Sequence, residues 1–120
     1  MNWETALRTY IEAANTHAAV TVQGDDAKKI NRAYDRIAQS VAVLMQSEEG
    51  KAALKALLQS PDGYVRTWTA VVLTAEEPRV CKKILKETAK ETGVWAGTVR
   101  TFLEEWKKGN LDSAFSRQNS

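Results

Sequence analysis

The sequence predicts an all-α protein in which six helices form three stacked antiparallel pairs. Three observations support this fold class. Apolar residues recur at helical spacing along most of the 120-residue chain. Only six residues are Gly and two are Pro, whereas the helix formers Ala, Leu, Lys and Glu are abundant. A short motif also returns after 34 residues, as expected of helix pairs that stack on one another.

The first predicted pair begins at Trp3. Its first helix is expected to end near Gly24, because glycine is suited to helix termination. Asp25 is expected to cap the second helix, and Asp26 adds negative charge to the first turn of that helix. The apolar stripes are Leu7, Tyr10, Ile11, Ala14 and Ala18 in the first helix, and Ile30, Tyr34, Ile37, Val41, Leu44 and Met45 in the second.

The second predicted pair begins at Ser47, the expected N-cap of a shorter helix whose first turn carries Glu48 and Glu49. Pro61 disfavours helical backbone at the residue before it, so residues 60–63 separate this helix from the next. The apolar faces are Ala53, Leu54, Leu57 and Leu58 in the third helix, and Val65, Trp68, Thr69, Val72 and Leu73 in the fourth.

The third predicted pair begins near Pro78, which a first helical turn tolerates, and its first helix is expected to stop at Gly93. Gly109 marks the end of the sixth helix. The inward stripes are Val80, Cys81, Ile84, Leu85 and Thr88 in the fifth helix, and Trp95, Val99, Phe102, Leu103 and Trp106 in the sixth. Residues 1–111 are therefore predicted to form one helical domain, and residues 112–120 a polar, frayed tail.

The repeated motif lies on the second helix of each pair. Residues 63–68 read Gly-Tyr-Val-Arg-Thr-Trp, and residues 97–102 read Gly-Thr-Val-Arg-Thr-Phe. One step further back, residues 31–34 keep only the Arg-x-aromatic core. The register therefore aligns two sets of residues, the arginines Arg32, Arg66 and Arg100 and the aromatics Tyr34, Trp68 and Phe102.

We predict structural roles for both sets. The aromatic residues are expected to fill the space between neighbouring pairs. The arginines are expected to bridge loop carbonyls and carboxylates between adjacent repeats, and the alternative is a row of three arginines that lines a ligand surface. Asp62 stands four residues before Arg66, a spacing that also suits an ion pair.

The stretch Ser-Pro-Asp-Gly-Tyr-Val-Arg at residues 60–66 resembles the start of the second helix of a HEAT repeat, in which an Asp precedes a Val-Arg pair. The wider pattern, in residues 31–36, 65–70 and 103–109, is similar to a family of small bacterial proteins, a domain of unknown function with a HEAT-like fold. The resemblance covers roughly residues 5 to 111 and implies a HEAT-like α-α superhelix. It transfers no catalytic residues, and it implies a place in bacterial toxin–immunity loci.

The residue types offer little for catalysis or metal binding. The single histidine, His17, is predicted to pack at the end of the first helix, and the single cysteine, Cys81, to be a buried and inert thiol. One His and one Cys cannot supply the usual zinc ligand sets, and the sequence has no Gly-rich phosphate loop. We therefore predict no catalytic, cofactor-binding or metal site, and a protein that is not an enzyme.

The sequence also favours a cytoplasmic location without membrane contact. No apolar run approaches the roughly 20 residues that span a bilayer. Residues 1–4 lack the basic start of a signal peptide, and no apolar stretch follows them. A single cysteine excludes an intrachain disulfide, which suits a reducing compartment.

The charge distribution bears on partners. The net charge of +2, from 17 basic and 15 acidic residues, is too balanced to indicate nucleic-acid binding by itself. Two basic stripes are interpreted as solvated faces because acidic residues interleave with them, and alternatively as phosphate-binding surfaces. One stripe comprises Lys82, Lys83, Lys86 and Lys90 with Glu87 and Glu91, and the other comprises Lys28, Arg32 and Arg36 with Asp35.

These observations favour a non-catalytic protein-binding module, and in particular an immunity protein that binds and neutralises a toxin domain. The alternatives are a HEAT-like nucleic-acid-binding protein and a self-associating assembly or scaffold protein. The chain is expected to be a monomer or a weak dimer. The candidate partner-binding residues are Trp3, expected to be the most exposed tryptophan, together with Arg32, Asp35 and Arg36.

Overall fold

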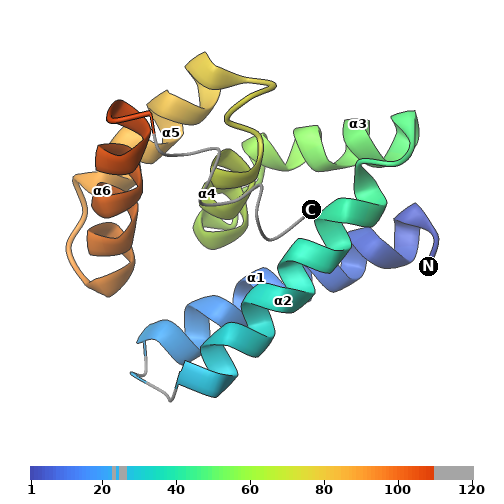
Figure 1. Cartoon of the computed structure of the whole chain (residues 1–120), viewed down its shortest axis with the longest axis horizontal. Coiled ribbons are helices and arrows are strands. Elements are labelled where there is room, and N and C mark those ends of the chain that lie inside the picture. The colour runs from blue at the N-terminus through green and yellow to red at the C-terminus, as the bar shows by residue number, and fades with distance from the viewer. Residues whose placement is uncertain (23, 25–26, 110–120) are drawn as a thin grey trace.

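The computed structural model describes residues 1–22, 24 and 27–109, and within these residues the chain is entirely helical (Figure 1). A short 3-10 turn, η1 (Leu57–Gln59), follows the third of six α-helices. The helices are α1 (Trp3–Val22), α2 (Ala27–Leu44), α3 (Glu48–Ala56), α4 (Gly63–Val72), α5 (Pro78–Ala89) and α6 (Val94–Lys107). The predicted all-α class and the six predicted helices are therefore confirmed. Within the described ranges, no helix is both long enough and apolar enough to cross a membrane.

Side-chain caps begin three of these helices. Asn2 caps α1, because its Oδ1 atom accepts from the Thr5 N–H at 2.8 Å. The Ser47 hydroxyl accepts a hydrogen bond from the Gly50 N–H at 3.0 Å, which confirms the predicted N-cap of α3. Asp62 caps α4, because one of its carboxylate oxygens accepts from the N–H groups of Tyr64 at 3.0 Å and Val65 at 3.3 Å. The carboxylate of Asp62 therefore serves the backbone rather than an ion pair with an arginine. The predicted caps at residues 25 and 26 lie outside the described residues.

Glycines in the left-handed region separate the helices of each outer pair. Gly24 has φ 69° and follows α1, and Gly109 has φ 82° and follows α6, so both helices end where the sequence predicts. The predicted end of α5 at Gly93 is wrong by several residues. Helix α5 stops at Ala89, and Gly93, with φ 103°, is instead the residue before α6.

The helices form a compact globule of 36 × 32 × 29 Å. Helix α2 folds back along α1, and α5 packs against both α4 and α6 (Figure 1). The middle pair differs from a simple hairpin, because α3 packs on α1 and α2 while η1 contacts α4. Helix α1 also contacts α6, so the first and last predicted pairs touch.

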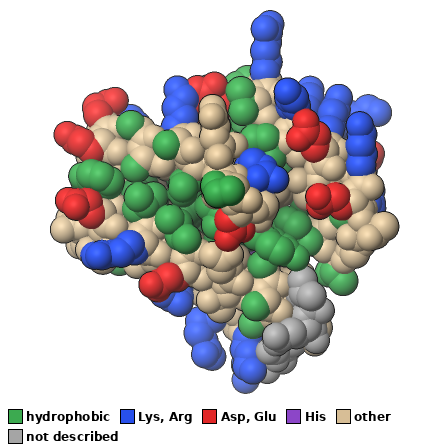
Figure 2. All heavy atoms as spheres, turned by 180° about the vertical axis from the view of Figure 1, so that it is seen from behind, with side chains coloured by type: hydrophobic (Ala, Val, Ile, Leu, Met, Phe, Trp, Pro, Cys, Tyr) green, Lys and Arg blue, Asp and Glu red, His purple; other side chains and the backbone are tan. Residues whose placement is uncertain are grey.

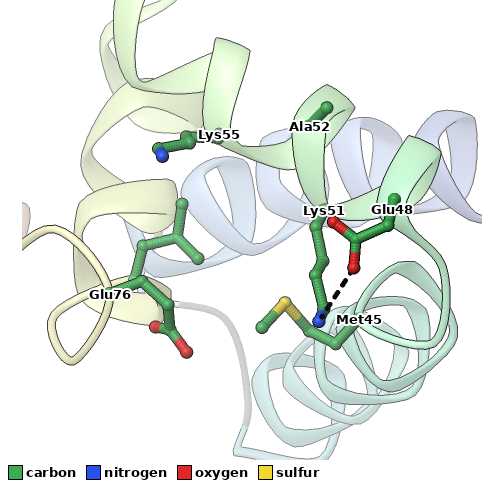
Figure 3. Close-up of a pocket in the computed structure, with 7 residues that line it drawn as sticks. Met45, Glu48, Lys51, Ala52, Lys55 and Glu76 are labelled. Carbon is green, nitrogen blue, oxygen red and sulfur yellow. Dashed lines mark ion pairs between the residues drawn. The ribbon is translucent and has the colours of Figure 1, made fainter.

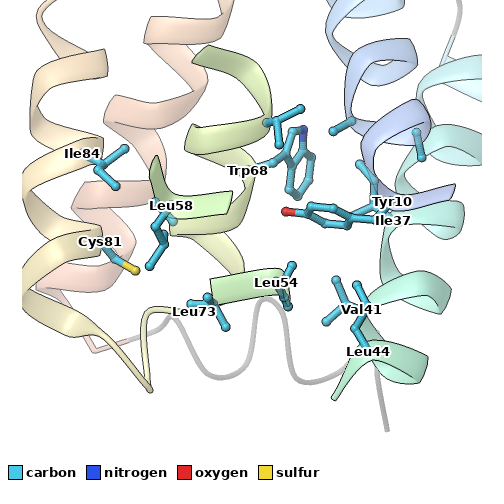
Figure 4. Packing of buried hydrophobic residues seen from close by; sticks show 14 of the residues in the cluster. Tyr10, Ile37, Val41, Leu44, Leu54, Leu58, Trp68, Leu73, Cys81 and Ile84 are labelled. Carbon is cyan, nitrogen blue, oxygen red and sulfur yellow. The ribbon is translucent and has the colours of Figure 1, made fainter. Parts of the chain in front are cut away.

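A single core runs through all six helices. Figure 4 shows Tyr10 of α1 pointing toward Trp68 of α4, with Val41 and Leu44 of α2 nearby. The buried residues follow the predicted stripes closely, with Tyr10, Ile37, Leu44, Leu54 and Leu85 fully buried. Burying one such side chain contributes about 1.5–3 kcal/mol to folding.

One predicted position is wrong, and one residue expected to be exposed is only partly exposed. Val80, expected on the inward stripe of α5, is 43% exposed because the first turn of that helix projects beyond its neighbours (Figure 1). Trp3, expected to be the most exposed tryptophan, is half-buried and packs against the core, since its indole supplies a large apolar surface at the start of α1.

Cys81 is fully buried, as predicted. Burial raises the pKa of its thiol to about 11, with smaller contributions from the negative charges of Glu77 and Glu76. The thiol therefore stays protonated near neutral pH and acts as a small apolar side chain in the core.

Candidate functional site: an aromatic groove

An aromatic groove lies where α1, α2, α4 and α6 meet, and its volume is about 270 Å³. Pockets that bind small molecules have volumes of about 300–1,000 Å³, so this groove is close to the lower limit. The lining residues are His17 of α1, Tyr34 of α2, Trp68 and Val71 of α4, and Trp95, Thr98, Val99 and Phe102 of α6. No Asp, Glu, Lys or Arg is among these lining residues, so the surface of the groove is predominantly apolar.

The groove has a buried floor and a more exposed rim. His17, Trp68, Trp95 and Val99 are buried and form the floor. Tyr34, Val71 and Phe102 are half-buried and Thr98 is exposed, so these residues form the rim. An incoming side chain therefore meets aromatic edges first and reaches two tryptophans at the bottom.

A cluster of rings centred on Trp68 joins the floor to Tyr34 of the rim. The ring of His17 meets that of Trp68 nearly at right angles, with the centroids 5.1 Å apart. The ring of Tyr34 lies 5.8 Å from that of Trp68, and the ring of Trp95 lies 5.9 Å from it. Aromatic pairs at such separations contribute about 0.5–1.5 kcal/mol each beyond their buried area. These ring contacts therefore stabilise the floor of the groove.

The three aromatic residues that the repeat aligns all line this groove. Tyr34, Trp68 and Phe102 come from α2, α4 and α6, at equivalent positions of the motif. The expected contact between neighbouring copies holds for Tyr34 and Trp68, whose rings touch. The sequence predicted only a filling role for these residues. Their common register was the signal that they face one shared surface.

The indole N–H groups of the floor lack acceptors. Trp68 is 5% exposed and Trp95 is 9% exposed, and neither Nε1 atom has a hydrogen-bond partner. The indole nitrogen can only donate, and a buried one usually finds an acceptor. A buried donor without a partner costs about 1–3 kcal/mol. Each Nε1 atom is also enclosed by protein atoms, so the missing acceptor is a cost of the fold rather than an open binding position.

His17 adds a neutral ring to the floor. It is 8% exposed, and this burial lowers the pKa of its imidazole below the usual value of 6.5. Its Nδ1 atom lies 3.4 Å from the Thr21 hydroxyl oxygen. The prediction that His17 is a packed residue is confirmed. At neutral pH it brings no formal charge to the groove.

Two hydroxyl pairs hold the groove floor on both sides of Trp68. The Tyr10 hydroxyl lies 2.9 Å from the Thr69 hydroxyl, which itself donates to the Val65 carbonyl at 2.7 Å. The hydroxyl groups of Thr67 and Thr88 lie 3.0 Å apart. Since Thr67 and Thr69 flank Trp68, these bonds attach α4 to α5 on one side and to α1 on the other.

Two arginines of the repeat close the turns that precede α4 and α6. Arg66 donates from Nη1 to the Ser60 carbonyl at 2.7 Å. Arg100 donates from Nη1 to the carbonyls of Ala89 at 2.8 Å and Glu91 at 3.3 Å. Side chains on a helix point back toward its N-terminus, which brings both guanidinium groups over the preceding turn.

The predicted contact with loop carbonyls is therefore confirmed for two of the three arginines. The predicted location between adjacent repeats is wrong, because each of these arginines bonds within its own helix pair. Arg32 is exposed, and it makes no hydrogen bond or ion pair with any residue that the structure describes.

The predicted partner-binding residues do not line the groove. Arg32, Asp35 and Arg36 are exposed together on α2, and Arg36 lies 3.8 Å from Glu12. Trp3 is half-buried at the start of α1. These four residues therefore share no site with the aromatic cluster.

A second cavity, also of about 270 Å³, lies at the corner of α2 and α3 and contains charged groups (Figure 3). Lys51 pairs with Glu48 at 3.7 Å, and Lys55 pairs with Glu77. Both lysines already have acidic partners, so their charges are less available to bind a ligand. We therefore regard the aromatic groove as the stronger candidate site. Among the described residues, no group of three or more His, Cys, Asp or Glu side chains is placed to hold a metal ion.

Comparisons of the chain with models of protein families, with curated proteins and with solved structures found no match. The chemistry of the groove is therefore interpreted from its own residues.

Proposed function

We propose that this chain is a non-catalytic protein-binding module, and that its aromatic groove receives an apolar side chain of the partner protein. The observation that carries the proposal is a groove of about 270 Å³ that is lined by aromatic side chains from α1, α2, α4 and α6, with no charged residue among its lining. An apolar side chain of a protein segment would fill such a groove without burying an unpaired charge.

A groove lined by aromatic residues is suited to be the centre of a protein–protein interface, where a few residues supply most of the binding free energy. Residues that dominate binding are enriched in Trp and Tyr and lie in well-packed pockets. A partner needs to cover about 800 Å² of each surface in a stable complex. The described surface of this chain is 7216 Å², so an interface centred on the groove would occupy roughly a tenth of it.

The proposed partner is a toxin domain, which makes the chain an immunity protein. This narrower form of the function is supported by the compact helical scaffold and by the uncharged lining of its groove. We also propose that the helix pairs are HEAT-like. The shared Gly-x-x-Arg geometry of α4 and α6 supports this relation, and the contact between α1 and α6 would close a short superhelix on itself.

The test is affinity capture from the lysate of the source organism, after nuclease treatment, with two matched variants. Phe102→Ala removes an aromatic side chain from the groove rim. Tyr64→Ala removes a half-buried aromatic side chain that contacts Trp95 from outside the groove lining. We expect one stoichiometric protein to be captured by the natural chain and by Tyr64→Ala, and to be lost with Phe102→Ala.

Two results would contradict the proposal. Equal capture by both variants would exclude the groove as the binding site. Recovery of only the chain itself would favour self-association. If a protein is captured through the groove, its toxicity when produced alone, and rescue of growth by this chain, test the immunity role separately.

A further inference from the structure

Helix α5 carries the strongest local concentration of positive charge in the described chain. Its residues Pro78–Ala89 include four basic side chains and one acidic side chain, and Lys90 follows directly. The basic residues are all exposed, and we call them the α5 basic face: Arg79, Lys82, Lys83, Lys86 and Lys90. The opposite side of the helix is buried in the core, so this face points to solvent.

The cations of the α5 basic face are not neutralised by neighbours. Among the described residues, Arg79, Lys83, Lys86 and Lys90 form no ion pair. The acidic residues Glu87 and Glu91 interleave with the lysines in sequence and yet pair with none of them. Lys82 instead lies over the indole of Trp106, 5.3 Å from the ring centroid.

The positive charge is also separated from the acidic part of the chain. Residues 78–109 hold eight basic and four acidic side chains, whereas the remainder holds nine basic and eleven acidic ones. Figure 2 shows Lys and Arg side chains gathered at the upper right, over the end of the molecule that α5 occupies. Such asymmetry produces a positive potential over one face even when the net charge is small.

We propose that the α5 basic face binds the phosphate backbone of nucleic acid. Lys82, Lys86 and Lys90 recur every four residues, which places a positive charge about every 6 Å along the helix. A partner with negative charges repeated along a line fits this row, and a polynucleotide is such a partner. The apolar side of α5 is buried, so the helix has no apolar face to insert into a lipid surface.

This activity is separate from the protein-binding groove. None of the five residues of the α5 basic face lines the aromatic groove. A nucleic acid bound there would therefore leave the groove open, and the two proposals stand or fall independently. The binding would be insensitive to base sequence, because backbone contacts carry no direct sequence information.

The test is fluorescence anisotropy of a labelled duplex DNA of about 20 base pairs, titrated with the full chain over a range of salt concentrations. Contact with three or four phosphates predicts that the logarithm of the binding constant falls with the logarithm of the salt concentration, with a slope of about −3 to −4. The α5 triple variant replaces Lys83, Lys86 and Lys90 with Ala. We expect it to bind at least about tenfold more weakly, with a correspondingly shallower slope.

The matched control replaces Arg8 of α1 and Lys51 and Lys55 of α3 with Ala, which removes the same number of positive charges from exposed positions outside both basic stripes. We expect the control to bind within about threefold of the natural chain. Alanine favours helix, and circular dichroism checks that both triple variants stay folded. Equal weakening by the two triple variants would overturn the proposal, because it would indicate only net-charge attraction. Absence of saturable binding at low salt, or equal displacement of the DNA by polyglutamate, would overturn it as well.

Discussion

Arg66 and Arg100 stand 34 residues apart, and each donates from Nη1 to backbone carbonyls that precede its own helix. Nη1 of Arg66 donates to the Ser60 carbonyl at 2.7 Å, and Nη1 of Arg100 donates to the Ala89 carbonyl at 2.8 Å. In each case a glycine stands three residues earlier, and a Cβ at Gly63 or Gly97 would make ordinary van der Waals contact, at 3.6 Å, with Nη2 of the arginine. The sequence repeat therefore encodes one way of closing a helical turn, and it fixes the two helices that supply most of the groove.

Arg66→Ala is expected to destabilise the fold by about 1–2 kcal/mol, because it removes a charged donor from the Ser60 carbonyl. The control is Arg32→Ala, at the equivalent position of the first copy, where the described structure has no such bond. It should change stability by less than about 0.5 kcal/mol. Urea denaturation measures the unfolding free energy of both variants. Equal destabilisation by the two substitutions would show that the hydrogen bond to Ser60 does not contribute to stability.

Gly50→Ala and Gly63→Ala are expected to have opposite effects. A Cβ at Gly50 would lie 2.3 Å from the Leu44 carbonyl oxygen, so α3 must shift away from the end of α2, at a cost of about 1–3 kcal/mol or more. At Gly63 the same Cβ meets only ordinary contact, and alanine there should be neutral or stabilising by up to about 1 kcal/mol. Thermal denaturation followed by circular dichroism compares the two variants, and a neutral Gly50→Ala would contradict this packing.

Stability is expected to decrease as the pH falls below the ordinary histidine range, because of His17. Burial lowers the pKa of its imidazole in the folded chain, whereas the unfolded chain keeps a pKa of about 6.5. The unfolded state therefore binds the proton first, so stability is greatest above about pH 6.5 and is lost as the pH falls toward the folded-state pKa. Urea titrations at pH 7.5 and pH 5.5 measure the difference.

His17→Phe is the control for this pH dependence, because it keeps a ring against Trp68 without a titrating group. The difference in unfolding free energy between the two pH values should be smaller in this variant than in the natural chain. An unchanged difference would assign the pH dependence to other groups.

The sequence predicted the helices well where a local signal exists. Ser47 caps its helix, Pro78 opens α5, and Gly24 follows α1, because capping and chain reversal depend on only a few adjacent residues. The position of α3 on α1 and α2 was not predicted. It depends on contacts between residues far apart in sequence, and apolar periodicity does not reveal which helix covers which.

The groove was half predictable. The register of Tyr34, Trp68 and Phe102 was visible in the sequence, and Trp95 lies on the same predicted stripe as Phe102, but neither the repeat nor the stripes added His17 to this surface. His17 joins it because α1 contacts α6, which a stack of pairs touching only its neighbours does not allow. Whether the α5 lysines form ion pairs also could not be predicted, because it depends on distances between side chains and not on the order of charged residues in the sequence.

The most direct test of the central claim uses the indole N–H resonances of the four tryptophans in a ¹⁵N–¹H NMR spectrum. The spectrum is recorded as the captured partner protein is added, and the resonances are assigned by single Trp→Phe variants. We predict that the N–H signals of Trp68 and Trp95 shift as the partner fills the groove that these residues line, while those of Trp3 and Trp106 stay in place. Unchanged signals from Trp68 and Trp95 in a formed complex would contradict the groove as the binding site.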